Sequence, residues 1–177
     1  FARHLSTPLL DTDADAVTLP PLDGELMVTT DGFTVQPLEF PGGNLGSLAV
    51  HGVVNDLAVA GADPRYLTLS ALIEEGLEVE VLDRLVASFA AAARESGVAV
   101  VAGDTKVVRR GEGGGLYRSV AGIGVKRAQA TLAIESIPPG DVVLVSGPVG
   151  DHGISVMLAR EQFGLSGELR SDSASVL

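Results

Sequence analysis

The apolar residues of this sequence fall into short runs that end at glycine, proline or charged residues, and their spacing predicts alternating strands and helices. Short runs rich in apolar and β-branched residues predict strands at 26–30, 65–73 and 98–101. Longer segments predict helices at 44–60 and 78–96. The order strand, helix, strand, helix, strand is typical of a sheet covered by helices.

The two predicted helices differ in their apolar pattern. The first is apolar on nearly every side, which is typical of a buried helix. Asn44 is suited to the N-cap of this helix, and Gly61 follows its last turn. In the second helix the apolar residues recur at helical spacing on one side only, and Gly97 ends the pattern. We therefore expect a buried first helix and a second helix with one face in water.

Two further segments, 106–110 and 116–125, look like strands and flank the glycine-rich segment 111–115. Strand-like runs joined by a short glycine-rich loop predict a β-hairpin. The sequence up to this point therefore predicts an α+β fold, with a mixed or antiparallel sheet covered by two helices.

A proline–glycine break at 138–140 divides the chain into predicted domains at 1–137 and 141–177. After the break, a continuous apolar run at 142–145 predicts a buried strand, and residues 151–163 predict a helix. The second unit therefore begins as the start of an α/β domain.

Composition and charge exclude several classes of protein. The 177 residues include no cysteine, and 23 acidic against 12 basic residues give a net charge of −11. Disulfide frameworks, zinc fingers and cysteine nucleophiles are therefore excluded within this sequence, and a nucleic-acid or anionic-membrane partner is disfavoured. No apolar run reaches the roughly 20 residues of a membrane helix, and no signal peptide is visible. We expect a cytoplasmic protein.

Two aspartates stand where predicted strands end. Asp31 closes the strand at 26–30, and Asp104 follows the strand at 98–101. Ligand sites of α/β sheets gather at the carboxyl ends of strands, so both are candidate ligands. The alternative is that each is a turn or cap residue.

A third aspartate, Asp56, lies within an apolar arc of the first predicted helix, with Gly52 one turn earlier. An unpaired buried carboxylate is costly, so it must meet a cation, a metal ion or hydrogen-bond donors. We expect either a ligand site here or a salt bridge to an arginine that faces the core.

Carboxylates that converge from separate elements would suit a Mg²⁺–phosphate site, because Mg²⁺ prefers hard oxygen ligands and phosphate. Lys106, two residues after Asp104, is suited to a phosphate contact, or else faces solvent on a strand. The segment 147–153 departs from the GxGxxG pattern of dinucleotide sites, and a tight turn with Asp151 as N-cap is the simpler interpretation.

Several motifs occur in an order that resembles a known family. They are TTDGFTV at 29–35, FPGGNLG at 40–46, VNDLAVAGA at 54–62, EEG at 74–76, GDTKVV at 103–108 and GPVGDHG at 147–153. Together they resemble the HypE family of hydrogenase maturation proteins, in the PurM-like (AIR synthetase-related) superfamily, over nearly the whole chain. The fold that this implies is a PurM-like N-terminal domain followed by the start of a second domain.

The resemblance implies an ATP-dependent carbamoyl dehydratase that uses Mg²⁺. Such an enzyme converts a carboxamide on the sulfur of its own C-terminal cysteine into a thiocyanate, which supplies cyanide to the iron of NiFe hydrogenases. It also implies a homodimer, whose N-terminal sheets form a barrel across the interface. The implied partners are a HypF-type carbamoyltransferase and the HypC–HypD scaffold.

The resemblance also carries over site residues. The metal–nucleotide aspartates of the superfamily match Asp13, Asp31, Asp56 and Asp104. The nucleotide-site blocks contain Asn55, Gly103, Thr105 and Lys106. The N-terminal acidic block departs from the family's pattern, because its second acid is displaced to Asp15.

The resemblance implies a fragment as well. In the family a glycine-rich segment precedes the first residue of this sequence, and the cysteine-bearing tail lies far beyond residue 177. We expect the fragment alone not to turn over. The alternatives are another PurM-like ATP-using enzyme, of the thiamine-monophosphate kinase or selenophosphate synthetase type, and a non-catalytic interaction module.

Overall fold

A four-stranded mixed sheet forms the centre of the protein, in a computed structural model that describes residues 2–5, 7–129, 132–160, 164 and 167–177. The strands lie side by side in the order β1 (Leu26–Phe33), β6 (Leu116–Lys126), β4 (Ala62–Glu74) and β5 (Ala99–Val108). β4 pairs in parallel with β5 and antiparallel with β6, which pairs antiparallel with β1. The predicted α+β class with a mixed sheet is therefore confirmed.

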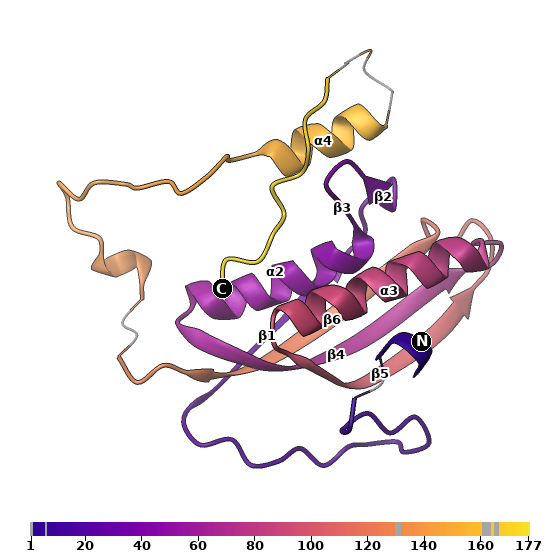
Figure 1. The fold of residues 1–177 in the computed structure, drawn as a ribbon, viewed down its shortest axis with the longest axis horizontal. Helices are drawn as coiled ribbons and strands as arrows, with labels where there is room; N and C mark the ends of the chain where they lie inside the picture. Colours follow the sequence, from indigo (N-terminus) through magenta and orange to yellow (C-terminus); the bar gives the residue numbers. More distant parts are fainter. Residues whose placement is uncertain (1, 6, 130–131, 161–163, 165–166) are drawn as a thin grey trace.

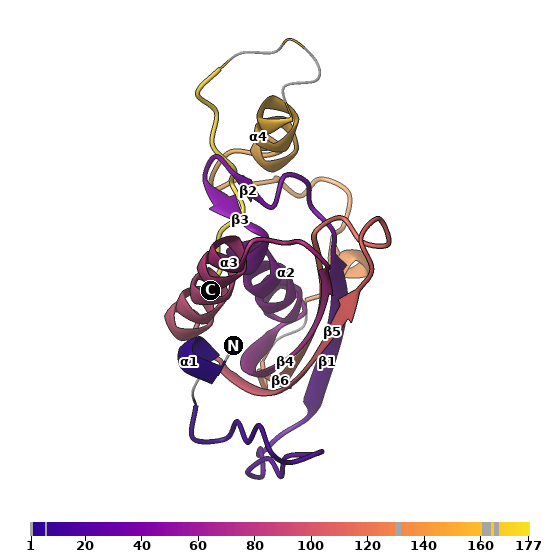
Figure 2. The same cartoon turned by 90° about the vertical axis from the view of Figure 1, so that its right-hand side faces the viewer.

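Two helices, α2 (Leu45–Val59) and α3 (Val79–Glu95), lie side by side on one face of the sheet (Figures 1 and 2). Asn44 caps α2, because its side chain accepts hydrogen bonds from the backbone N–H groups of Gly46 and Ser47. In turn, the Ser47 hydroxyl accepts a hydrogen bond from the backbone N–H of Asn44, which completes a capping box. Both helices confirm the prediction, with their starts and ends within one residue of the expected positions.

The remaining elements are short. They are α1 (Ala2–Leu5), β2 (Glu39–Phe40), β3 (Gly43–Asn44), the 3₁₀ helix η1 (Ile134–Ser136) and α4 (Asp151–Ala159). β2 and β3 pair antiparallel in a turn that leads into α2. Among the described helices, none has both the length and the apolar character that a membrane crossing needs.

The core lies between the sheet and the two helices. α2 and α3 approach each other closely at Gly46, where a Cβ atom would lie only 2.2 Å from the backbone oxygen of Leu85. Apolar side chains of both helices and of β4 and β6, such as Phe89, Leu67 and Val120, are buried in this layer. The second residue of α2 is therefore a glycine because the backbone of α3 leaves no room for a side chain.

The opposite face of the sheet carries no helix in the described part of the chain (Figure 2). Apolar side chains nevertheless point to this side. Leu26 and Val28 of β1 are 57% and 69% exposed, and Leu72 of β4 is 40% exposed. The sheet thus has one packed face and one open face with apolar character.

The predicted hairpin of 106–110 with 116–125 is wrong. β5 is one continuous strand that includes Gly103 and Asp104, and β4 lies between β5 and β6. The glycine-rich connection therefore passes over the end of β4, where the Glu74 carboxylate accepts hydrogen bonds from the N–H groups of Gly111 at 2.6 Å and Gly115 at 2.7 Å. The strand that separates β5 from β6 comes from earlier in the chain.

The predicted strand at 142–145 is also absent among the described residues. The four apolar side chains are 64% to 90% exposed, and no strand of the described chain lies beside them. A strand needs a paired neighbour for its backbone groups, so an apolar run alone does not form one. The predicted helix at 151–163 is present as α4 up to Ala159, and its last predicted residues, 161–163, lie outside the described part of the chain.

Candidate functional site

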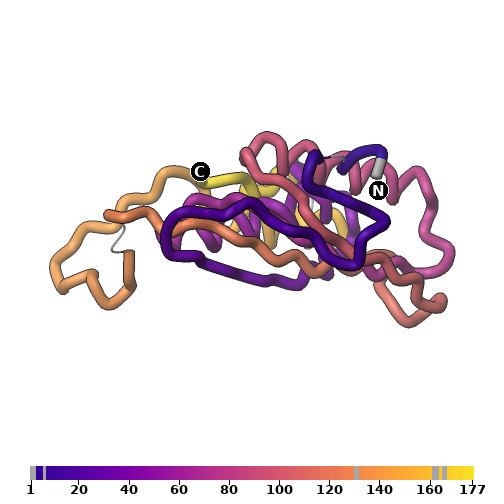
Figure 3. The backbone as a smooth tube through the Cα atoms, turned by 90° about the horizontal axis from the view of Figure 1, so that it is seen from below, coloured from indigo at the N-terminus to yellow at the C-terminus, as the bar shows by residue number. Residues whose placement is uncertain are grey.

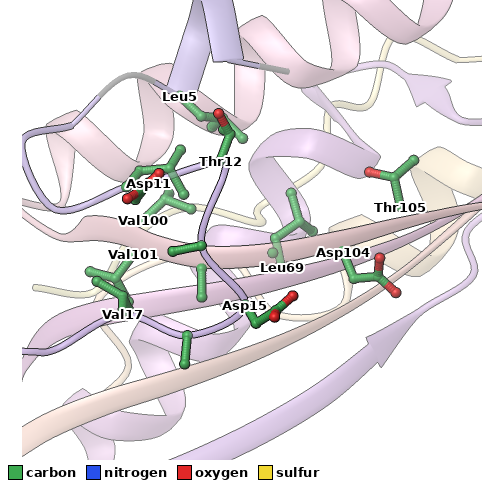
Figure 4. Close-up of a pocket in the computed structure, with 15 residues that line it drawn as sticks. Leu5, Asp11, Thr12, Asp15, Val17, Leu69, Val100, Val101, Asp104 and Thr105 are labelled. Atoms are coloured by element: carbon green, nitrogen blue, oxygen red, sulfur yellow. The ribbon is translucent and has the colours of Figure 1, made fainter.

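A cavity of about 200 Å³ lies between β5 and the N-terminal segment (Figure 4). Residues 7–25 run along the sheet without a helix or strand, and Figure 3 shows this course before the chain turns into β1. The apolar floor of the cavity includes Leu69, Val100 and Val101. Its polar lining includes Asp11, Thr12, Asp15, Asp104 and Thr105. The cavity therefore combines an apolar base with three carboxylates at its edge.

The N-terminal acidic block contributes different residues from those expected. Asp13 donates its backbone N–H to the Asp11 carboxylate at 2.9 Å, which is a local turn of the Asx type. Asp11 and Asp15 line the cavity, whereas Asp13 lies outside the lining and is exposed. Asp11 was not among the predicted site residues. The signal that could have identified it is its spacing, two residues before Asp13, which is typical of an Asx turn.

The GDTK motif lies in the middle of β5, at the edge of the sheet. Gly103 is needed there because a Cβ atom would lie 2.7 Å from the backbone oxygen of Leu69 on β4. Asp104 and Lys106 point to the same side of the strand, and their charged groups lie 3.4 Å apart. Both side chains are more than half exposed, so the lysine remains free to leave this pair for an anionic ligand. Thr105 completes the polar rim of the cavity.

Asp31 and Asp56 form a second acidic group, between β1 and α2. Asp56 accepts a hydrogen bond from the Thr29 hydroxyl at 3.1 Å, and Asp31 accepts one from the backbone N–H of Gly32 at 2.7 Å. A Cβ atom on Gly52 would lie 2.9 Å from the Phe33 ring and 3.8 Å from an Asp31 carboxylate oxygen. The absence of a side chain at this glycine lets α2 approach the end of β1.

The expected burial of Asp56 is wrong, because its side chain is exposed at the edge of α2. The helix is buried on the side that carries Leu45, Ala49, Val53 and Leu57, and Asp56 lies beside this stripe. The group that donates a hydrogen bond to the Asp56 carboxylate is the Thr29 hydroxyl, and not the predicted arginine. The apolar character of α2 on its other sides therefore does not mean that those sides face the core.

The two acidic groups do not converge within one chain. β1 and β5 are the opposite edges of the sheet, three strand spacings or about 14 Å apart. Asp31 pairs with the buried Val120 and so faces the helices, whereas Asp104 pairs with Ser70 on the open side. Among the described residues, no three carboxylate or imidazole groups are arranged to hold one metal ion. The described part of a single chain therefore does not bring these acids together, and their role as metal ligands stays a prediction.

Asn55, which is expected at the nucleotide site, contacts the C-terminal segment of the described chain. Its side-chain N–H donates to the backbone oxygen of Ala174 at 2.8 Å, and its side-chain oxygen accepts from the N–H of Val176 at 2.9 Å. Both ends of the amide are therefore engaged by one stretch of backbone.

The FPGGN and GDHG motifs lie against each other. The rings of Phe40 and His152 meet edge to face with their centres 5.2 Å apart. Ser171 donates its N–H to the backbone oxygen of Pro41 at 2.8 Å, and a Cβ atom on Gly42 would lie 2.6 Å from that same nitrogen. Gly42 also has a φ of +92°, which favours glycine. These motifs therefore dock the later part of the chain onto the turn before α2.

The start of α4 corrects the expected cap. The N-cap residue is Gly150, and Asp151 is the first residue of the helix. The capping carboxylate comes from Asp172, which accepts the N–H of His152 at 2.7 Å. Backbone N–H groups, that of His152 foremost, hold the pKa of the Asp172 carboxyl below its usual value. The carboxylate that caps α4 therefore comes from Asp172, which is distant in the sequence, and not from Asp151 as predicted.

Residues 12–126 match the family described as AIR synthase related protein, N-terminal domain. Among curated relatives, the carbamoyl dehydratase HypE of Rhizobium leguminosarum bv. viciae is 48% identical over 164 residues, which is 93% of this chain and 46% of that protein. The carbamoyl dehydratase HypE of Escherichia coli (strain K12) is 49% identical over 149 residues, which is 84% of this chain and 44% of that protein.

Solved structures agree with these relatives. A crystal structure of the hydrogenase maturation protein HypE superposes with a TM-score of 0.92 at 44% identity, and covers 99% of this chain and 54% of that one. A HypE structure in complex with ATP gives a TM-score of 0.83 at 43% identity, over 99% of this chain and 52% of that one. A HypE–HypF complex gives 0.82 at 45% identity, over 99% of this chain and 56% of that one.

The chain spans about half the length of the curated relatives that it matches. The family match covers the whole sheet with α2 and α3, from the acidic N-terminal block to the end of β6. The chain therefore belongs to the AIR synthase related protein family, in which its relatives are hydrogenase maturation proteins of the HypE type.

Proposed function

We propose that this chain is the nucleotide-binding half of an ATP-dependent carbamoyl dehydratase that acts in the cytoplasm in NiFe-hydrogenase maturation. The observation that carries the proposal is the cavity that Asp15, Asp104 and Thr105 line, with Lys106 close to Asp104 on the same strand. A relative of the same fold at 43% identity has been solved with ATP. Relatives at 48% and 49% identity are named carbamoyl dehydratase.

The residues of the cavity fit a magnesium nucleotide. Asp15 and Asp104 offer two of the hard oxygen ligands that Mg²⁺ prefers, and phosphate oxygens and water would complete the coordination of the ion at the cavity edge. When bound, ATP supplies the phosphoryl group that turns the carboxamide oxygen into a leaving group, so that loss of phosphate and both amide protons leaves a nitrile.

The side chains around the cavity would orient this reaction. Lys106 lies beside Asp104 on the same strand and would exchange that contact for a phosphate oxygen. The Thr105 hydroxyl lines the same cavity and can donate a hydrogen bond to a ligand there. The apolar floor excludes water from one side, which strengthens charge interactions at the reacting phosphate.

The partners in this proposal are a second copy of the chain, a HypF-type carbamoyltransferase and the HypC–HypD scaffold. The open apolar face of the sheet would pair with its copy to form a barrel, and one relative has been solved as a HypE–HypF complex. A HypF-type carbamoyltransferase would load the carboxamide. The HypC–HypD scaffold would receive the cyanide.

Titration calorimetry of the full-length protein with ATP and Mg²⁺ tests this function. Asp104→Asn removes a charged oxygen ligand and keeps the shape, so the Kd for Mg-ATP should rise about tenfold to a hundredfold. Asp141→Asn, an equivalent change at an exposed residue remote from the cavity lining, serves as the control and should leave the Kd unchanged. Absence of ATP binding by the full-length protein would overturn the proposal.

A further inference from the structure

The C-terminal residues 171–177, which we call the strap, lie along the outer side of α2. Figure 1 shows this segment descending from α4 to the far end of α2. The strap has no helix or strand, so its own backbone groups are left to bond elsewhere. Side chains of α2 supply these partners.

The side chain of Asn55 binds backbone atoms of the strap. The side-chain amide donates to Ala174 O at 2.8 Å and accepts from Val176 N at 2.9 Å, so one side chain holds a carbonyl and an N–H two residues apart. His51, one turn earlier on α2, places Nδ1 3.3 Å from the backbone oxygen of Ser173. These contacts use only backbone atoms of the strap and are therefore independent of its side chains.

The other end of the strap is tied to α4. The Ser171 hydroxyl lies 3.0 Å from His152 Nδ1 and 2.7 Å from the Ser173 hydroxyl, and Asp172 caps the helix. These bonds join α4, the strap and α2 in one connected set. Movement of α4 relative to the sheet would therefore stretch the bonds at Asn55.

We infer that Asn55 is a positioning residue that fastens the second half of the protein beside the acidic group on α2. The inference rests on the proposed function. Asn55 and Asp56 are consecutive on one rigid helix, and Asp56 is held in turn by Thr29. The strap backbone and the carboxylate are thereby fixed to the same helical turn. The polypeptide that follows the strap in a protein of the relatives' length starts from this fixed point.

The strap takes half of the hydrogen-bonding capacity of the amide. A side-chain amide offers two N–H donors and an oxygen with two lone pairs. The strap takes one donor and one of the lone pairs. Loss of the amide should therefore affect the placement of the second half more than the affinity for ATP.

Asn55→Leu in the full-length protein tests the inference, since it keeps the size of the side chain and removes both the nitrogen that donates to Ala174 O and the oxygen that accepts from Val176 N. Hydrogen exchange at the Val176 amide should accelerate about tenfold or more. The kcat for ATP-dependent dehydration should fall by about tenfold, while the KM for ATP stays within about twofold. Asn55→Gln keeps both amide groups and should recover part of the kcat. Val59→Ala, one turn further along α2 at a residue that is 66% exposed, is the control and should leave strap exchange and kcat unchanged.

Two results would overturn the inference. One is a KM or Kd for ATP that rises tenfold while strap exchange stays as in the wild type, because Asn55 would then contact the nucleotide. The other is faster strap exchange with unchanged kcat, because the fastening would then not serve the reaction. If the wild type binds no ATP, the proposed function fails, and unchanged strap exchange in Asn55→Leu would separately disprove the fastening.

Discussion

Arg118 is the one large charged side chain buried between the sheet and the helices in the described part of the chain. It is 2% exposed, and its guanidinium lies over the Phe89 ring, 5.4 Å from the centroid. One nitrogen donates to Leu85 O at 3.4 Å, whereas Nε and the other terminal nitrogen find no partner among the described residues. Burial lowers the pKa of Arg118 to about 10, because the charged form loses its hydration.

Arg118→Met should stabilise the fold. The methionine keeps most of the packing against Phe89 and removes a charge that is buried without a counter-ion, so we expect a gain of about 1–3 kcal/mol. The pKa of Arg118 is lower in the folded than in the unfolded protein, so the buried charge destabilises the fold fully below pH 10. This destabilisation decreases as the pH rises above 10. Urea unfolding from pH 6 to 9 should therefore show a constant gap between the variant and the wild type. A destabilised Arg118→Met would mean that the guanidinium has a partner that compensates its burial.

At the scale of elements, Glu74 fastens the connection between β5 and β6. The N–H bonds from Gly111 and then Gly115 hold the pKa of the Glu74 carboxyl below its usual 4.5. Because the pKa of Glu74 is lowered in the folded protein, its carboxylate stabilises the fold above pH 4.5. This stabilisation is lost as the pH falls through the pKa of the folded protein. Glu74→Gln should speed amide exchange at both glycines at neutral pH and remove the acid-dependent loosening. Glu75→Gln, at the neighbouring exposed acid, is the comparison; equal effects would contradict a specific role of Glu74.

The elements that local sequence determines were predictable, and those that depend on distant partners were not. Asn44 and Gly61 mark the ends of α2 because capping acts within one turn. The order of β5 and β6 depends on β4, which inserts between them from earlier in the chain. The exposure of Asp56 likewise depends on how α2 rotates toward β1. The apolar run at 142–145 satisfied the strand pattern but has no paired neighbour in the described chain.

At the scale of the whole molecule, the open face of the sheet and the split acidic groups point to a larger assembly. Asp104 lies toward the open face at one edge of the sheet, and Asp31 lies toward the helices at the other. The apolar side chains of Leu26, Val28 and Leu72 lie on the open face. An exposed apolar sheet face of this kind is typical of an interaction site. Burying it against a second copy is the homodimer that the proposed function contains.

Val28→Glu tests this assembly, because a carboxylate forced into an apolar interface costs several kcal/mol. We expect the full-length wild type to sediment as a dimer at micromolar concentration, and the variant to sediment as a folded monomer with a dimer Kd raised about a hundredfold or more. Val59→Glu is the matched control, because Val59 on α2 is 66% exposed and Val28 is 69% exposed. It should leave the dimer intact. If both variants dissociate, net charge rather than this face governs association, and if neither does, the dimer uses another surface.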